Sequence, residues 1–182
     1  MRKILIIFIF ISTIFTQADI KITEAIISFT GSHPFHDWTG ISTDLKLDLN
    51  CSDNDKTCHY LFSVPWTSFD SRNDNRDNNM LYYVNAYEFH NIKMTFKDVK
   101  LDSILKFNSE AHNLEGTLSI AGVNKLIYIP INFEFTESYY KLQSEFSLKV
   151  SDFNIERPTL LMIPINDEII IKVKFSGEIL IN

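Results

Sequence analysis

The 182-residue sequence predicts an all-β protein. Apolar and polar residues alternate through most of the chain, and side chains spaced by two residues lie on one face of a β-strand. Short polar segments separate these runs, as expected for turns between antiparallel strands. Spacing typical of a helix occurs in one segment. These observations indicate about eight long strands in a single domain, arranged as a sandwich or an up-and-down barrel.

The N-terminal segment has the features of a secretory signal peptide. A basic start and an apolar run over residues 4–15 precede the small residue Ala18. This run is short for a membrane-spanning helix, which needs roughly 20 residues, and an uncleaved anchor is the alternative. We therefore expect residues 1–18 to be a signal peptide and residues 19–182 to be the mature domain. The protein is then periplasmic or secreted, without a stable membrane anchor.

Each predicted strand has one apolar and one polar face. In residues 127–135, for example, Ile129, Ile131 and Phe133 take alternate positions and share one face. The predicted strands cover residues 24–31, 38–50, 59–69, 90–101, 116–120, 127–135, 141–150 and 168–181.

Residues 70–89 depart from the strand pattern. Their first half is polar, and their second half has apolar residues at the i, i+3, i+4, i+7 spacing of a helix. We expect one short helix near residues 77–87, lying over an open end of the sheet. The residues with this spacing are Met80, Leu81, Tyr83, Val84 and Tyr87.

The two cysteines, Cys51 and Cys58, flank a polar insert that is typical of a turn between strands. An exported protein meets an oxidising compartment, so we expect them to form a disulfide. A metal site is the alternative, but two cysteines at this spacing lack two further ligands.

The charge of the chain limits the class of partner. The formal net charge of −6, from 17 basic and 23 acidic residues, becomes −8 without Arg2 and Lys3. Nucleic acid and anionic membrane surfaces both favour a basic patch, so neither is expected as a partner. The chain is 45% hydrophobic and has fifteen Phe and seven Tyr, which allows a large apolar interior.

Two polar clusters are candidates for chemistry. His33, His36 and Asp37 could carry a proton or bind a metal. However, the sequence has no nucleophile at a strained turn and no further ligand at a recognisable spacing. We expect a rim loop with Trp38 as a packing anchor, and neither a catalytic residue, a metal site nor a cofactor.

The second cluster lies in the polar segment before the predicted helix. It is typical of a solvated turn with a helix cap, and the alternative is a site for a ligand head group or a cation. Arg76 is the best head-group candidate because a guanidinium suits phosphate. The cluster consists of Asp70, Arg72, Asp74, Arg76 and Asp77.

Three blocks of sequence carry a family resemblance. Residues 68–96 contain a Ser and an Asp, then an Arg-Asp pair (Arg76 and Asp77), and then the aromatic Phe89 before an alternating strand. Residues 114–135 combine a G-x-L-x-I strand, a Gly-Val-x-Lys turn and a strand that runs into Pro.

The third block lies near the C-terminus. Residues 151–158 have an Asp-Phe-x-Ile corner, and residues 166–175 form a strand opened by Asp-Glu. In their order and spacing, the three blocks resemble the YceI-like family of exported polyisoprenoid-binding proteins. The segment of residues 28–40 and the cysteine turn depart from the family pattern.

The resemblance implies an eight-stranded antiparallel, lipocalin-like extended β-barrel with an isoprenoid-type lipid or a quinone tail inside it. An eight-stranded barrel leaves room for side chains or for one small ligand. Because no catalytic constellation stands out in the sequence, we expect a binding protein that is not an enzyme, and the resemblance allows a homodimer. The alternative function is a barrel with a filled core, acting as a protein-interaction or envelope stress-response module. Internal volume distinguishes the two.

The strand parity and the resemblance together predict which residues meet the ligand. Lys46, Lys97, Glu134 and Lys149 are expected to point to solvent. The expected tunnel lining is Phe62, Val64, Met94, Phe96, Leu118, Ile129, Ile131, Phe133, Phe146, Val173 and Phe175. The alternative for the aromatic residues of the mouth is ordinary packing of the helix onto the end of the barrel. The expected mouth is Trp38, Trp66, Tyr83, Tyr87, Phe89, Phe153 and Arg76.

Overall fold

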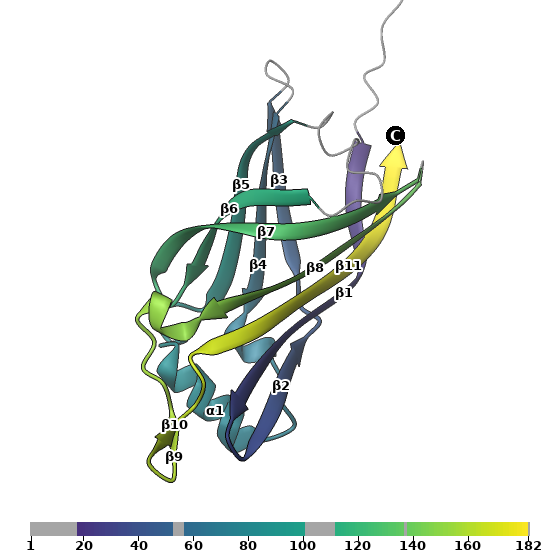
Figure 1. Cartoon of the computed structure of the whole chain (residues 1–182). Coiled ribbons are helices and arrows are strands. Elements are labelled where there is room, and N and C mark those ends of the chain that lie inside the picture. Colours follow the sequence, from purple (N-terminus) through teal and green to yellow (C-terminus); the bar gives the residue numbers. More distant parts are fainter. Residues whose placement is uncertain (1–17, 53–56, 101–111, 137, 182) are drawn as a thin grey trace, which may run out of the picture.

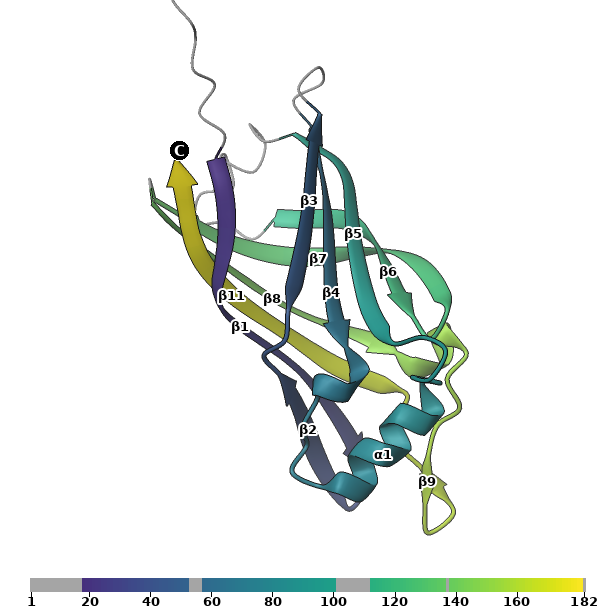
Figure 2. The same ribbon diagram turned by 180° about the vertical axis from the view of Figure 1, so that it is seen from behind.

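The computed structural model describes residues 18–52, 57–100, 112–136 and 138–181. Residues 1–17 lie outside this range, so the signal peptide stays a prediction. The described chain is dominated by one nine-stranded antiparallel sheet that curls into a barrel-like wall (Figures 1 and 2). Across the sheet the strands are β2 (His36–Ser42), β1 (Ala18–His33), β11 (Glu168–Ile181), β8 (Tyr139–Lys149), β7 (Val123–Phe135), β6 (His112–Ile120), β5 (Asn91–Lys100), β4 (Thr57–Pro65) and β3 (Lys46–Ser52).

The all-β, barrel-like fold is confirmed, with nine strands in the sheet instead of eight. The extra strand arises because residues 38–50, predicted as one strand, are divided between β2 and β3. The buried Ser42 accepts a hydrogen bond from the Asp44 N–H at 3.1 Å through its hydroxyl oxygen, and this local bond replaces ladder pairing. A separate hairpin of β9 (Thr159–Leu160) and β10 (Ile163–Pro164) was not predicted.

A short bridge links the edge strand β2 to the segment that follows η1 (Trp66–Ser68). Within the described ranges no ladder pairs β3 with β1 or β2. Instead, the Ile41 N–H of β2 donates to the Asp70 carbonyl at 3.0 Å, and the Asp70 N–H donates back at 2.9 Å. The segment that follows β4 and the 3₁₀ helix η1 therefore pairs with the edge of β2 at this one position.

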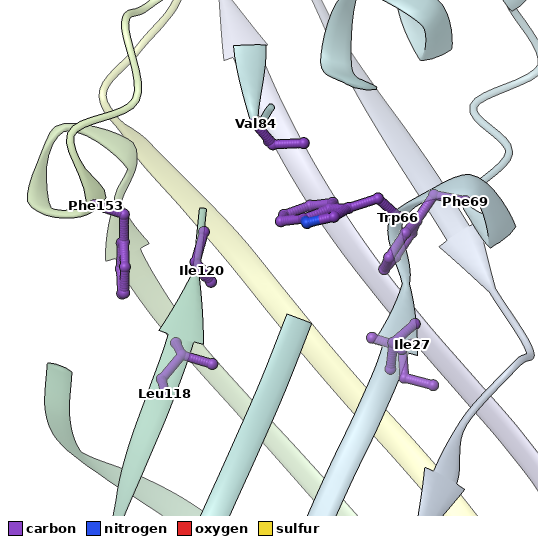
Figure 3. Packing of buried hydrophobic residues seen from close by; sticks show 8 residues of the cluster. Ile27, Trp66, Phe69, Val84, Leu118, Ile120 and Phe153 are labelled. Atoms are coloured by element: carbon purple, nitrogen blue, oxygen red, sulfur yellow. The ribbon is translucent and has the colours of Figure 1, made fainter. Parts of the chain in front are cut away.

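Strands β7 and β8 diverge from one another along their length (Figure 1). Their ladder covers residues 132–135 and 140–143 only. Pro130 lacks an N–H, and its carbonyl accepts from the Ser144 hydroxyl at 2.7 Å. Beyond this point the 3₁₀ helix η2 (Val150–Phe153) follows β8, and its Phe153 is buried against Leu118 and Ile120 (Figure 3).

The helix α1 (Asp74–Tyr83) lies at one end of the curled sheet (Figures 1 and 2). It begins three residues before the predicted position because the Asn73 side chain caps it, accepting from the Arg76 N–H at 3.0 Å. It ends four residues early because Asn85 has φ +49°, the left-handed conformation that commonly terminates helices.

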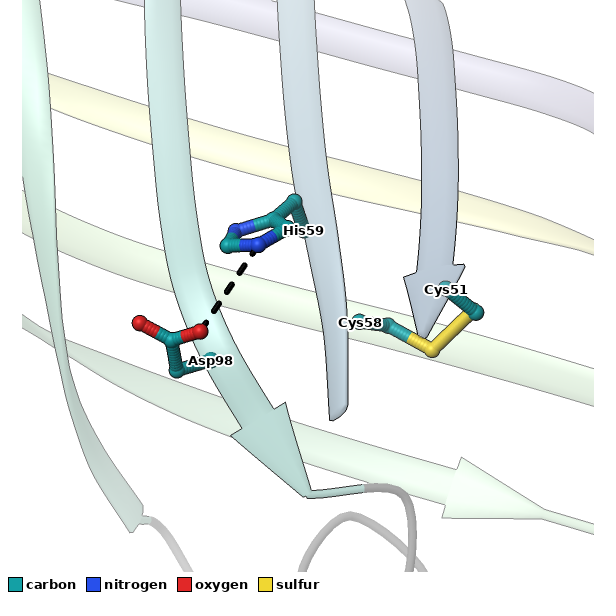
Figure 4. Close-up of a disulfide and its surroundings, with 4 residues drawn as sticks. All are labelled: Cys51, Cys58, His59 and Asp98. Carbon is teal, nitrogen blue, oxygen red and sulfur yellow. Dashed lines mark ion pairs between the residues drawn. A yellow bond between two sulfur atoms is a disulfide. The ribbon is translucent and has the colours of Figure 1, made fainter. Parts of the chain in front are cut away.

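At the other end of the molecule, a disulfide joins two neighbouring strands. Cys51 of β3 and Cys58 of β4 are paired directly in the ladder, with their sulfurs bonded at 2.07 Å (Figure 4). Next to them, His59 and Asp98 approach to 3.6 Å on the outer surface. The disulfide thus fixes the register of β3, an edge strand with neighbours on one side only.

Candidate functional site

A cavity of about 520 Å³ lies inside the curled sheet and extends to α1. Its walls are predominantly apolar, and its polar side chains gather where α1 and the turns of the β1–β2 and β9–β10 hairpins meet. Buried clusters adjoin it: Val64 and Trp66 belong to the cluster beneath α1, and Phe96 and Ile129 belong to a second cluster near the disulfide. The interior is therefore partly filled and partly open.

Ten of the eleven predicted tunnel residues line this cavity. The exception is Phe133, which packs at the side of the second cluster, where its ring stacks on Phe135 with the centroids 6.2 Å apart. The four side chains expected to face solvent, those of Lys46, Lys97, Glu134 and Lys149, are all exposed. The residues that line the cavity are Phe62, Val64, Met94, Phe96, Leu118, Ile129, Ile131, Phe146, Val173 and Phe175.

The predicted mouth is divided by the structure. Trp38, Trp66, Tyr83 and Arg76 line the cavity. Tyr87, Phe89 and Phe153 do not, and each lies elsewhere for a local reason.

Tyr87 is 93% exposed because it follows the end of α1. The Phe89 ring covers Gly122, where an added Cβ would lie 2.4 Å from the ring. Phe153 is 2% exposed because it fills the space beside η2, and it therefore belongs to the core.

Arg76 presents a charged group at the cavity mouth. Its Nε donates to the Ser71 hydroxyl at 2.9 Å and its Nη2 donates to the Ser71 carbonyl at 3.1 Å. The guanidinium carbon lies 5.9 Å from the centre of the Trp38 ring. Asp77 acts indirectly, because its carboxylate accepts from the Ser71 N–H at 3.1 Å and so positions the residue that holds Arg76.

The Arg76 guanidinium has five N–H donors, and the two bonds to Ser71 leave three without a protein acceptor in the described chain. In the same ranges, no carboxylate forms an ion pair with it. The neighbouring Arg72 is exposed, and its N–H donates to the Asp70 carboxylate at 2.6 Å. The acidic and basic cluster is thus a turn and a helix cap, from which only Arg76 faces the cavity.

His33 is a structural residue at the mouth. It is 4% exposed, its Nε2 lies 3.2 Å from the Ile163 carbonyl, and its Nδ1 accepts from the Phe35 N–H at 3.4 Å. These partners assign the ring proton to Nε2. In the part of the chain that the structure describes, no three His, Cys, Asp or Glu side chains could hold a metal ion. The arrangement agrees with a rim loop in which Trp38 packs against His36.

Two groups of wall residues were missed by the sequence reasoning. Ile92, Leu148 and Ile171 line the cavity, and the same alternation that identified their strands could have found them. Leu160 and Ile165 also line it, but they belong to the β9–β10 segment, which has no periodic signal.

Burial changes the acidity of two tyrosines in the sheet. Desolvation raises the pKa of Tyr60 above its usual value of 10.0 and raises that of Tyr140 to about 12. The Tyr140 hydroxyl is buried and has no hydrogen-bond partner in the described chain. Both groups are neutral near pH 7.

A curled antiparallel sheet around an apolar cavity, with a short helix at one end, defines a lipocalin-like β-barrel protein. The family model of the YceI-like domain matches residues 19–177, and the chain belongs to this family. The family resemblance inferred from the sequence blocks is therefore confirmed. Comparison with curated protein sequences gave no match.

Several solved structures are similar to this chain. BcnA of Burkholderia cenocepacia has 13% sequence identity and a TM-score of 0.67, over 84% of this chain and 95% of BcnA. A polyisoprenoid binding domain from Saccharophagus degradans, implicated in plant cell wall breakdown, has 14% identity and a TM-score of 0.69, over 90% of this chain and 98% of that domain. The YceI protein of Campylobacter jejuni has 19% identity and a TM-score of 0.59, over 76% of this chain and 83% of that protein. At these identities the likeness shows a shared fold.

Proposed function

We propose that this protein binds the apolar chain of an isoprenoid-type lipid or a quinone in the cavity and catalyses no reaction on it. The observation that carries the proposal is the cavity of about 520 Å³ with apolar walls, a size within the roughly 300–1,000 Å³ of small-molecule sites. Each methylene group moved from water to such walls contributes about 0.8 kcal/mol. A long chain can therefore bind tightly without a charged partner.

The distribution of polar groups gives the bound molecule a direction. Arg76, Asn73 and Asn79 line the α1 end of the cavity, whereas Leu142 and Phe175 line its apolar depth. The polar end of the ligand then lies beside α1, with its tail directed toward Phe175. A phosphate or a quinone oxygen accepts hydrogen bonds from the free Arg76 donors.

Other features support export and the type of protein that we propose. The N-terminal pattern of a signal peptide and the Cys51–Cys58 disulfide both suit a periplasmic or secreted protein. Across the described residues, every helix is too short and too polar to traverse a lipid bilayer. The family and the similar polyisoprenoid binding domain support a binding protein. The filled-core module is less well supported because a cavity adjoins the packed clusters. A homodimer remains a prediction.

Lipid analysis tests the proposal directly. Protein purified from its native envelope should release an isoprenoid-type lipid on extraction, as identified by mass spectrometry. Purified empty protein should take up solanesol or a long-chain ubiquinone at one molecule per chain. A preparation that is consistently empty and takes up neither compound would contradict the proposal and favour the filled-core module.

A further inference from the structure

Exposed apolar side chains surround the cavity mouth on two hairpin turns. In the β9–β10 turn, Leu161 is 74% exposed and Met162 is 97% exposed. In the β1–β2 turn, Phe35 is 61% exposed. Both turns lie at the α1 end of the molecule and extend in the same direction (Figures 1 and 2).

The β9–β10 turn is unfavourable in isolation. Leu161 and Met162 have φ values of +51° and +66°, the left-handed conformation at both central positions of a two-residue hairpin turn. Asn and Gly are the residues that suit this turn. The chain instead holds two long apolar residues in a conformation they disfavour and exposes both to water. Nothing within the described chain covers these two side chains, and exposed apolar residues held in a disfavoured conformation are the kind of feature that marks an interaction site.

The two turns are held together and are attached to the mouth. The His33 ring meets the Ile163 carbonyl at 3.2 Å, and the Asn166 N–H donates to the Ser32 carbonyl at 2.9 Å. In the same hairpin, Leu160 lines the cavity while the next residue, Leu161, points outward. A surface that covers the apolar turns therefore also meets the cavity opening.

We propose that these turns insert their apolar side chains into the surface of a zwitterionic lipid bilayer and place the cavity mouth against it. This inference rests on the proposed function, since a chain that passes directly from bilayer to cavity avoids exposure to water. The surface of a bilayer can bury apolar side chains that protrude in the same direction from two separate hairpins. The formal net charge of −8 that remains without Arg2 and Lys3 favours apolar contact over attraction to anionic lipids.

Vesicle flotation with phosphatidylcholine tests the docking. The variant Leu161→Asn/Met162→Gly replaces the apolar turn by residues that prefer its conformation, so it should fold at least as stably as the wild type. Removing each immersed side chain should weaken vesicle partitioning about tenfold. This factor corresponds to the lower end of the free energy gained by burying a Leu or Met side chain. The matched control is Ile26→Thr, which removes a 51% exposed apolar side chain from the wall of the sheet and should leave partitioning unchanged.

Uptake of farnesol added from ethanol separates the two proposals. Equal uptake by the wild type and the double variant, with vesicle binding lost only in the variant, supports docking. Absence of vesicle binding by the wild type, or equal vesicle binding by the variant, overturns docking and leaves the turns for a protein partner. Absence of farnesol uptake by both proteins contradicts the proposed cavity function, whereas the flotation result still decides the docking.

Discussion

Replacing Ile129 by Trp should shorten the cavity while leaving the outer surface of the sheet unchanged. Ile129 is 7% exposed, lies on β7 opposite Leu114, and lines the cavity. Trp has about six more side-chain non-hydrogen atoms than Ile, so it occupies roughly the space of one five-carbon isoprene unit. At about 0.8 kcal/mol per carbon, excluding one unit removes up to about 4 kcal/mol of binding free energy. The Kd for the longest chain then rises by as much as about a thousandfold.

Two assays measure this effect. Mass spectrometry of lipids bound to Ile129→Trp should show a shift to chains about one isoprene unit shorter, and titration with prenols of graded length should show the same displacement. Overpacking costs about 1–3 kcal/mol, so the variant should still fold. Leu126→Trp, at a 63% exposed position on the outer face of the same strand, is the control. An unchanged lipid profile in a folded Ile129→Trp protein would refute the assignment of this face to the ligand.

Three further changes test the mouth, the sheet and the disulfide. Arg76→Ala should weaken binding of a prenyl phosphate about tenfold and leave an uncharged prenol unaffected; calorimetry should show no such difference for the exposed Arg72→Ala. Stability should fall as the pH rises from 10 to 12, because the unfolded chain loses the Tyr140 proton near pH 10 and the folded protein loses it at about 12. In urea titrations across this pH range, Tyr140→Phe should lose less stability than the wild type. An equal dependence of stability on pH in both proteins would contradict this role of Tyr140. Replacing Cys51 and Cys58 by Ser should lower the free energy of unfolding by up to about 2.5 kcal/mol, whereas an undiminished denaturation midpoint would contradict the stabilising role.

The wall of the cavity was predictable because it depends on a local period. In a long strand, alternation shows which residues share the apolar face, and Ile129 of β7 and Phe175 of β11 were assigned to the cavity in this way. Burial of the apolar face then fixes the register of each strand. The predicted helix ends were wrong because capping by Asn73 and the left-handed Asn85 are single-residue effects that apolar spacing does not include. Phe153 was assigned to the mouth, but it lies in the core. The sequence could not show this, because the position of Phe153 depends on the divergence of β7 and β8, which is a tertiary feature.

The cavity wall and the hydrophobic core share residues, so binding and stability are coupled. Val64, Leu118 and Ile129 each belong to a buried cluster and also line the cavity. A bound apolar chain would contact the side of these residues that protein atoms leave open, and it would be released on unfolding. A ligand that binds only the folded state at 100 times its Kd adds about 2.7 kcal/mol to the free energy of unfolding. Solanesol should therefore raise the Tm of the wild type and raise that of Ile129→Trp less. Equal shifts in both proteins would place the bound chain away from Ile129.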